Sequence, residues 1–128
     1  MPVEIKLLVW SVALTLLQMV TAVLGGMSSV GLPALVGNRE NVPRPDGWVG
    51  RAQRSHVNML ESFALFAALV LTVHVTAKAN AMTALGAQLF FFARLVYVPV
   101  YLIGIPWLRT GVWGVSIVGL LLILGQLL

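Results

Sequence analysis

Four long apolar stretches dominate this sequence of 128 residues. They run over approximately residues 4–36, 48–76, 81–103 and 107–127. At a rise of about 1.5 Å per residue, each is long enough to cross the roughly 30 Å of hydrocarbon in a bilayer. Hydrophobic residues make up 59% of the chain and charged residues only 9%, whereas soluble domains carry about 25% charged residues. We therefore predict an all-α integral membrane protein, a four-helix bundle forming one domain over residues 1–128.

The same composition excludes several other classes of protein. The chain is too apolar for a disordered protein, and without cysteine it has no disulfide framework. Its net charge of +4 would suggest a nucleic-acid partner in a soluble protein. Here the basic residues lie inside or beside the apolar stretches, so we expect no nucleic-acid partner. With no cysteine and two histidines far apart, we also expect no metal site.

The basic residues at the ends of the stretches predict an orientation. Four crossings place both termini on one side of the membrane. The basic residues on the opposite side, at the 1–2 and 3–4 connections, are Arg39, Arg44, Arg51, Arg54 and Arg109. Only Lys6 and Lys78 lie on the side of the termini. The excess of positive charge in cytoplasmic loops then predicts cytoplasmic connections and termini on the outer side of the membrane. In a bacterial inner membrane, the termini would be periplasmic.

One face of the second stretch is polar. Its residues Arg51, Arg54, Asn58 and Glu61 are spaced i, i+3, i+7 and i+10, so they lie on one side of a helix. Glu61 lies roughly 15 Å along the axis from Arg51, where an unpaired carboxylate is costly. The third stretch offers Arg94 as a partner for Glu61. Such a pair could equally be a purely structural link between two helices.

The last three stretches carry more positive charge than this pair neutralises. Four arginines face the single acid Glu61, which leaves a surplus of three positive charges. These arginines are Arg51, Arg54, Arg94 and Arg109. In the third stretch, Tyr97 and Tyr101 share a helical face with Arg94. Because guanidinium groups bind carboxylates through two parallel hydrogen bonds, we expect an anion with more than one negative group.

Arg109 has a distinctive position near the start of the fourth helix. It follows Pro106 by three residues, and proline favours the first position of a helix. The free N–H groups and the positive dipole end of that helix add to its charge, and Thr110 supplies a hydroxyl beside it. A thiol bound there would have a lowered pKa. The alternative is an arginine that only anchors the helix end at the membrane interface.

Two groups of these residues resemble a known family. The segment Arg51–Glu61, followed by Phe63–Phe66, resembles the second-helix signature of the MAPEG superfamily, approximately R-x-x-R-A-x-x-N-x-x-E-x-x-P-x-F. The segment Ala93–Tyr97, with Tyr101 and Arg109, resembles the matching part of its glutathione-using members, the microsomal glutathione transferases and leukotriene C4 synthase. Alanine stands at 64 where proline is usual, and serine at 55 where alanine is usual. The entry to the second stretch is more similar to a bacterial branch.

The resemblance implies a left-handed bundle, assembled as a homotrimer with glutathione held between subunits. It implies that glutathione is the co-substrate and that a lipophilic second substrate enters from the lipid bilayer. The residues expected to bind glutathione are Arg51, Arg54, Asn58, Glu61, Arg94, Tyr97, Tyr101 and Thr110. By the same resemblance, Arg109 is the catalytic residue that stabilises the thiolate.

We therefore predict a glutathione transferase or peroxidase that acts on lipophilic electrophiles or lipid hydroperoxides. The alternative is a non-catalytic structural or accessory membrane subunit, which keeps the polar residues only to hold a trimer together. A transporter is disfavoured, because the sequence lacks the repeated broken helices typical of alternating access. The sequence by itself leaves enzymatic activity open.

Overall fold

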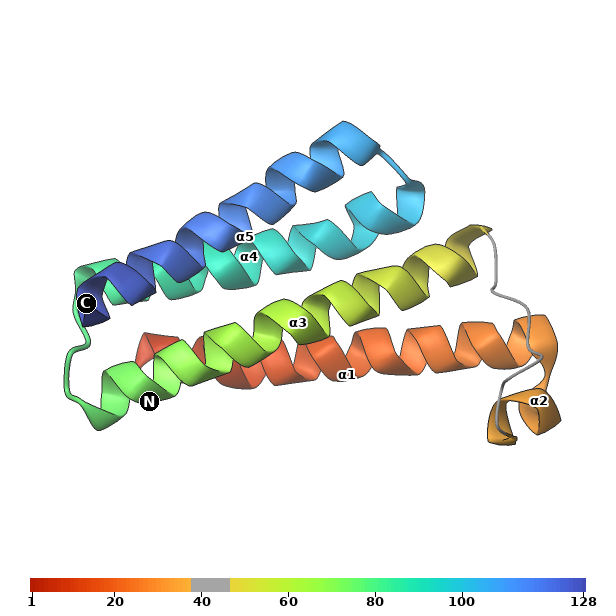
Figure 1. Ribbon diagram of the computed structural model, residues 1–128, viewed down its shortest axis with the longest axis horizontal. Coiled ribbons are helices and arrows are strands. Elements are labelled where there is room, and N and C mark those ends of the chain that lie inside the picture. Colours follow the sequence, from red (N-terminus) through yellow and green to blue (C-terminus); the bar gives the residue numbers. More distant parts are fainter. Residues whose placement is uncertain (38–46) are drawn as a thin grey trace.

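The computed structural model of the protein describes residues 1–37 and 47–128, and all the regular secondary structure over these ranges is helical. The helices are α1 (Val3–Val30), α2 (Leu32–Val36), α3 (Gly47–Val75), α4 (Ala81–Ile103) and α5 (Pro106–Leu127). Four of them, all but α2, are long and apolar enough to cross a membrane. The prediction of an all-helical chain with four helices of membrane-spanning length is thereby confirmed. Both chain ends lie at the same end of the bundle (Figure 1). Of the arginines used to predict its orientation, Arg39 and Arg44 lie outside the described residues.

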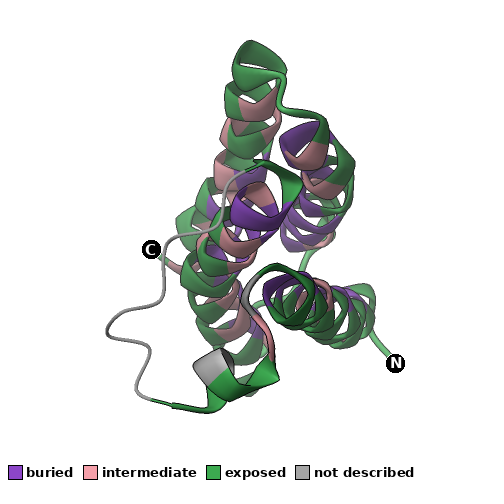
Figure 2. Ribbon diagram, turned by 90° about the vertical axis from the view of Figure 1, so that its right-hand side faces the viewer, coloured by how far each residue is buried: buried purple, intermediate pink, exposed green. Residues whose placement is uncertain are grey.

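The four long helices pack in a simple order. α1, α3 and α4 contact one another, and α5 packs mainly against α4 (Figure 1). At the centre, the rings of Phe66 on α3 and Phe90 on α4 stack with centroids 4.2 Å apart. Figure 2 shows buried positions between the helices and exposed positions on their outer faces. Many of the exposed side chains are large and apolar, such as Leu17, Leu65 and Leu121. Such a surface suits lipid or further protein rather than water.

The first apolar stretch differs from its prediction. A single helix over 4–36 is wrong, because α1 ends at Val30 and a separate short helix, α2, follows. Gly31 joins them with a φ of 86°, a conformation that favours glycine. Proline in the first turn of α2 starts the new helix. The connection after α4 is similar, since Gly104 is left-handed and Pro106 begins α5.

Polar contacts fix the end of the bundle that holds the chain termini. Asn80 caps α4 by accepting hydrogen bonds from the backbone N–H groups of Met82 and Thr83. Its Nδ2 donates to Gln126 Oε1 at 2.8 Å, which joins the start of α4 to the end of α5. At this same end, His74 Nε2 on α3 lies 2.9 Å from Glu4 Oε2 on α1.

Two helices approach each other closely where Gly86 on α4 meets Gly119 on α5. A Cβ on Gly119 would lie 2.5 Å from the carbonyl oxygen of Gly86. We expect Gly119→Ala to force the helices apart and to cost about 1–3 kcal/mol of stability. The matched control is Gly125→Ala on the same helix, since nothing lies within 4 Å of its added methyl group. Thermal unfolding in detergent should show a lower Tm for Gly119→Ala alone. Equal Tm values for both variants would contradict the close packing.

Candidate functional site

The arginines and tyrosines singled out in the sequence gather at one end of the bundle. This end lies opposite the chain termini, where α3 begins, α4 ends and α5 begins (Figure 1). We call this set of residues the arginine–tyrosine cluster. Its members are Arg51, Arg54, Arg94, Tyr97, Tyr101 and Arg109.

Tyr101 is the residue on which three helices converge. It is buried near the end of α4, and its hydroxyl oxygen accepts a hydrogen bond from Arg54 Nε on α3 at 3.2 Å. The guanidinium carbon of Arg109, on α5, lies 4.9 Å from the centroid of the Tyr101 ring. A cation over an aromatic face is attracted by the ring. One tyrosine therefore positions two arginines that are far apart in the sequence.

Arg94 lies deeper in the same cluster. It is only 1% exposed, and its guanidinium carbon lies 4.2 Å from the centroid of the Tyr97 ring. Tyr97 in turn contacts Tyr101, with ring centroids 5.4 Å apart. Within the described residues, none of the three guanidinium nitrogens has a hydrogen-bond partner. The contact with Tyr97 offsets only part of the cost of burying this charge. Arg94 therefore indicates a partner that residues 1–37 and 47–128 do not supply.

Arg51 has a different environment. Its Nε donates to the carbonyl oxygen of Leu102 at 2.9 Å. That carbonyl is one of the last four in α4, and these have no N–H partner within the helix. The positive charge also faces the negative dipole end of the helix. Arg51 thus fastens the start of α3 to the end of α4.

Glu61 does not pair with Arg94 within the chain, so the predicted ion pair is wrong for one subunit. Glu61 is exposed on α3, whereas Met59 is completely buried. Two residues correspond to about 200° around a helix, so Glu61 faces away from the side that packs on α4. Asn58 is half-buried, and its Oδ1 has no hydrogen-bond partner among the described residues.

Thr110 also lies apart from the cluster contacts. It is exposed, and its hydroxyl donates to the carbonyl oxygen of Pro106 at 3.0 Å, within its own helix. The start of α5 is as predicted, with Pro106 in the first turn. The Arg109 N–H already donates to the carbonyl of Ile105 at 3.0 Å, so the free N–H groups are those earlier in the turn.

The cluster concentrates positive charge, and no acidic side chain among the described residues pairs with it. Over residues 1–37 and 47–128, the one close contact between a basic and an acidic side chain joins His74 to Glu4, at the opposite end of the bundle. Four guanidinium groups therefore share one end of three helices, and one of them is fully buried. Arranged in this way, the guanidinium groups suit an anion with more than one negative group, such as a carboxylate or a thiolate.

A buried polar pair next to this end was not predicted from the sequence. Gln18 Nε2 on α1 donates to Ser55 Oγ on α3 at 2.9 Å, and both side chains are buried. The available signal was that Gln18 is the only amide side chain in the run from Leu7 to Leu24.

Comparison with known proteins gives one match. A family model described as the MAPEG family matches residues 7–128, a span that includes the whole arginine–tyrosine cluster. Neither the curated proteins nor the solved structures that were compared give a match.

Proposed function

The chain belongs to the MAPEG family, and from this premise we propose that it binds glutathione in the membrane and activates its thiol. The family includes glutathione transferases and related proteins. The observation that carries the proposal is Arg94, a buried guanidinium whose nitrogens have no partner among the described residues. The proposed products are conjugates of lipophilic electrophiles, or alcohols formed by reducing lipid hydroperoxides.

Glutathione has the negatively charged groups that could pair with the arginines of the cluster. It carries two carboxylates, one ammonium group and one thiol. In this proposal the carboxylates accept hydrogen bonds from Arg94 and Arg54, because planar guanidinium groups match carboxylate geometry. Asn58 Oδ1, which has no partner among the described residues, would accept a hydrogen bond from the peptide part of the ligand.

We propose a homotrimer in which Glu61 acts across the boundary between subunits. On α3, the apolar side chains of Val57, Leu60 and Leu65 are exposed on both sides of Glu61 along the helix. A carboxylate on such a surface is costly against lipid. A neighbouring subunit would cover the surface and bring its own glutathione to Glu61, where the carboxylate would meet the ammonium group.

In this mechanism Arg109 stabilises the glutathione thiolate, and the thiol proton passes to water at the mouth of the site. The sulfur then forms a bond to the electrophilic carbon, and the leaving group departs with its electron pair. With a hydroperoxide, the sulfur attacks the terminal oxygen and the O–O bond breaks. The alkoxide takes up a proton to give the alcohol, and a second glutathione converts the sulfenic acid to disulfide and water. Tyr101 holds Arg54 and Arg109 in place during these steps.

Masking the carboxylates of the ligand tests the proposed binding. We expect purified protein in detergent to bind glutathione at least about 100-fold more tightly than glutathione diethyl ester. The ester loses charge-assisted hydrogen bonds of about 1.5–3 kcal/mol each. Equal affinities would show that the arginines do not hold the carboxylates. If neither compound binds, the structural-subunit alternative replaces the proposal.

A further inference from the structure

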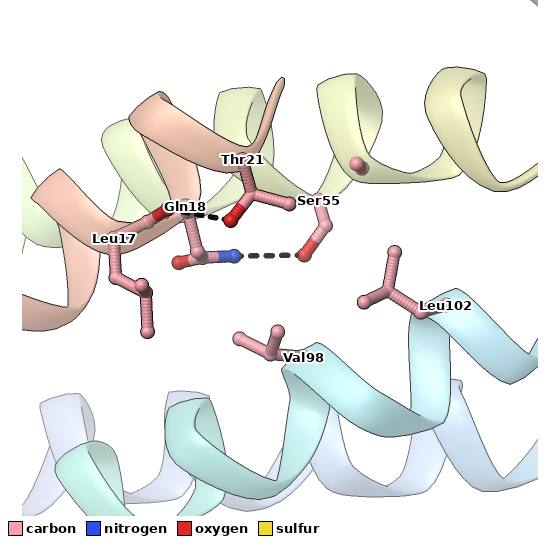
Figure 3. A pocket seen from close by; sticks show the side chains of 7 residues that line it. Leu17, Gln18, Thr21, Ser55, Val98 and Leu102 are labelled. Atoms are coloured by element: carbon pink, nitrogen blue, oxygen red, sulfur yellow. Dashed lines mark hydrogen bonds between the residues drawn. The ribbon is translucent and has the colours of Figure 1, made fainter. Parts of the chain in front are cut away.

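A cavity of about 120 Å³ lies between α1, α3 and α4. Much of its wall is apolar and includes Leu17, Val98 and Leu102 (Figure 3). Leu17 is 62% exposed, so this side of the cavity adjoins the outer, lipid-facing surface. No residue of the arginine–tyrosine cluster lines the cavity. The cavity is therefore separate from the proposed glutathione site.

The polar edge of the cavity has hydrogen-bonding capacity that the described residues leave unused. Gln18 is 4% exposed and projects its amide group into the space near Leu17 and Val98 (Figure 3). Its Nε2 donates to Ser55 Oγ, but its Oε1 has no partner among the described residues. A buried carbonyl oxygen without a hydrogen-bond donor is costly, so a ligand that donates a hydrogen bond to this atom would be stabilised.

Ser55 and Thr21 differ in whether their hydroxyl protons already have an acceptor. The Thr21 hydroxyl donates to the carbonyl oxygen of Leu17 at 2.8 Å, so its proton is used. The Ser55 oxygen accepts from Gln18, and no acceptor for its own proton occurs among the described residues. The cavity thus offers a free acceptor on Gln18 and a free donor on Ser55, which are hydrogen-bonded neighbours.

We propose that this cavity binds the hydroxyl end of a lipophilic alcohol. The hydroxyl proton would be donated to Gln18 Oε1, and the hydroxyl oxygen would accept the proton of Ser55. No charged side chain lines the cavity, which disfavours an ionic ligand. An apolar cavity of about 150 Å³ can hold benzene, so this one holds the last few heavy atoms of a chain that extends toward the lipid.

A pair of isomeric probes tests this proposal on the full-length protein in detergent. The probes are 1-hexanol and pentyl methyl ether, which have the same formula but differ in the O–H group. Saturation-transfer NMR measures the affinity of each. We expect hexanol to bind about tenfold more tightly, because the ether cannot donate to Gln18. Equal affinities would overturn the proposal in favour of a purely apolar cavity. Binding of neither probe would overturn it in favour of a water-filled one.

Two variants then locate the binding. Gln18→Leu keeps an apolar side chain of similar size but removes the acceptor, so hexanol should lose its advantage over the ether. Ser55→Ala is a smaller change that preserves folding more safely, and it should also weaken hexanol binding severalfold. Both variants should bind glutathione normally, and Arg109→Ala should bind hexanol normally. Unchanged hexanol preference in both cavity variants would place the alcohol elsewhere.

Discussion

Replacing Arg94 with methionine should make the ligand-free protein more stable and abolish its binding of glutathione. Arg94 is 1% exposed and has no hydrogen-bond partner among the described residues, so the charge is costly before a ligand arrives. Methionine is an apolar side chain of similar length, so it removes the cost of burying the charge. It also loses the attraction between the guanidinium group and the Tyr97 ring, which reduces the gain. We expect a gain of about 1–3 kcal/mol. Glutathione affinity should fall at least about 100-fold, because a bound carboxylate loses its buried partner.

The matched control for this result is Arg51→Met. The Arg51 guanidinium already donates to the carbonyl of Leu102, so its removal leaves an acceptor unpaired at the end of α4. We expect that variant to lose about 1 kcal/mol of stability, the opposite sign to Arg94→Met. Tm values measured in detergent with and without glutathione distinguish the two. A lowered Tm and normal glutathione binding in Arg94→Met would make Arg94 a structural residue.

Arg109→Ala should slow the reaction while leaving the protein folded. Arg109 is half-buried in the first turns of α5, and Tyr101 keeps its hydrogen bond to Arg54 without it. The thiolate loses a charge-assisted partner of about 1.5–3 kcal/mol. The pKa of the bound thiol should therefore rise by about one to two units, and conjugation at neutral pH should slow about ten- to a hundredfold.

The test of this prediction is a pH titration of the bound thiol together with turnover. Arg109→Lys should recover only part of the rate, because the ammonium group lacks the planar fork of guanidinium. Glutathione affinity should change little in either variant, since Arg54 and Arg94 remain. An unchanged thiol pKa and unchanged turnover in Arg109→Ala would make this arginine a membrane anchor.

The long helices could be predicted from the sequence because hydropathy and length determine which segments cross a bilayer. The break at Gly31 carries the same signal as the break at Gly104, since in both places a proline follows the glycine by two residues. At Gly104–Pro106 the prediction of a break was correct. At Gly31–Pro33 the apolar residues continue to Val36, so hydropathy favoured one long helix, and the positive φ of Gly31 instead separates α1 from α2.

The arrangement of the site was predictable in part. Helical spacing placed Arg94, Tyr97 and Tyr101 on one face of α4, and the structure brings them together. Spacing does not say which way a face points, so Glu61 was assigned to Arg94 although it faces away from the bundle core. The Gln18–Ser55 contact joins residues 37 positions apart, and no local pattern relates them.

The most direct test of the proposed function is the ultraviolet difference spectrum of purified protein with saturating glutathione at neutral pH. The account predicts the absorption band of a thiolate, since a cluster of four arginines at the ends of α3, α4 and α5 would hold the ionised thiol. S-methylglutathione, which cannot form a thiolate, should bind without producing the band. If glutathione at saturating concentration gives no more absorption than its S-methyl derivative, thiolate activation at this cluster is contradicted.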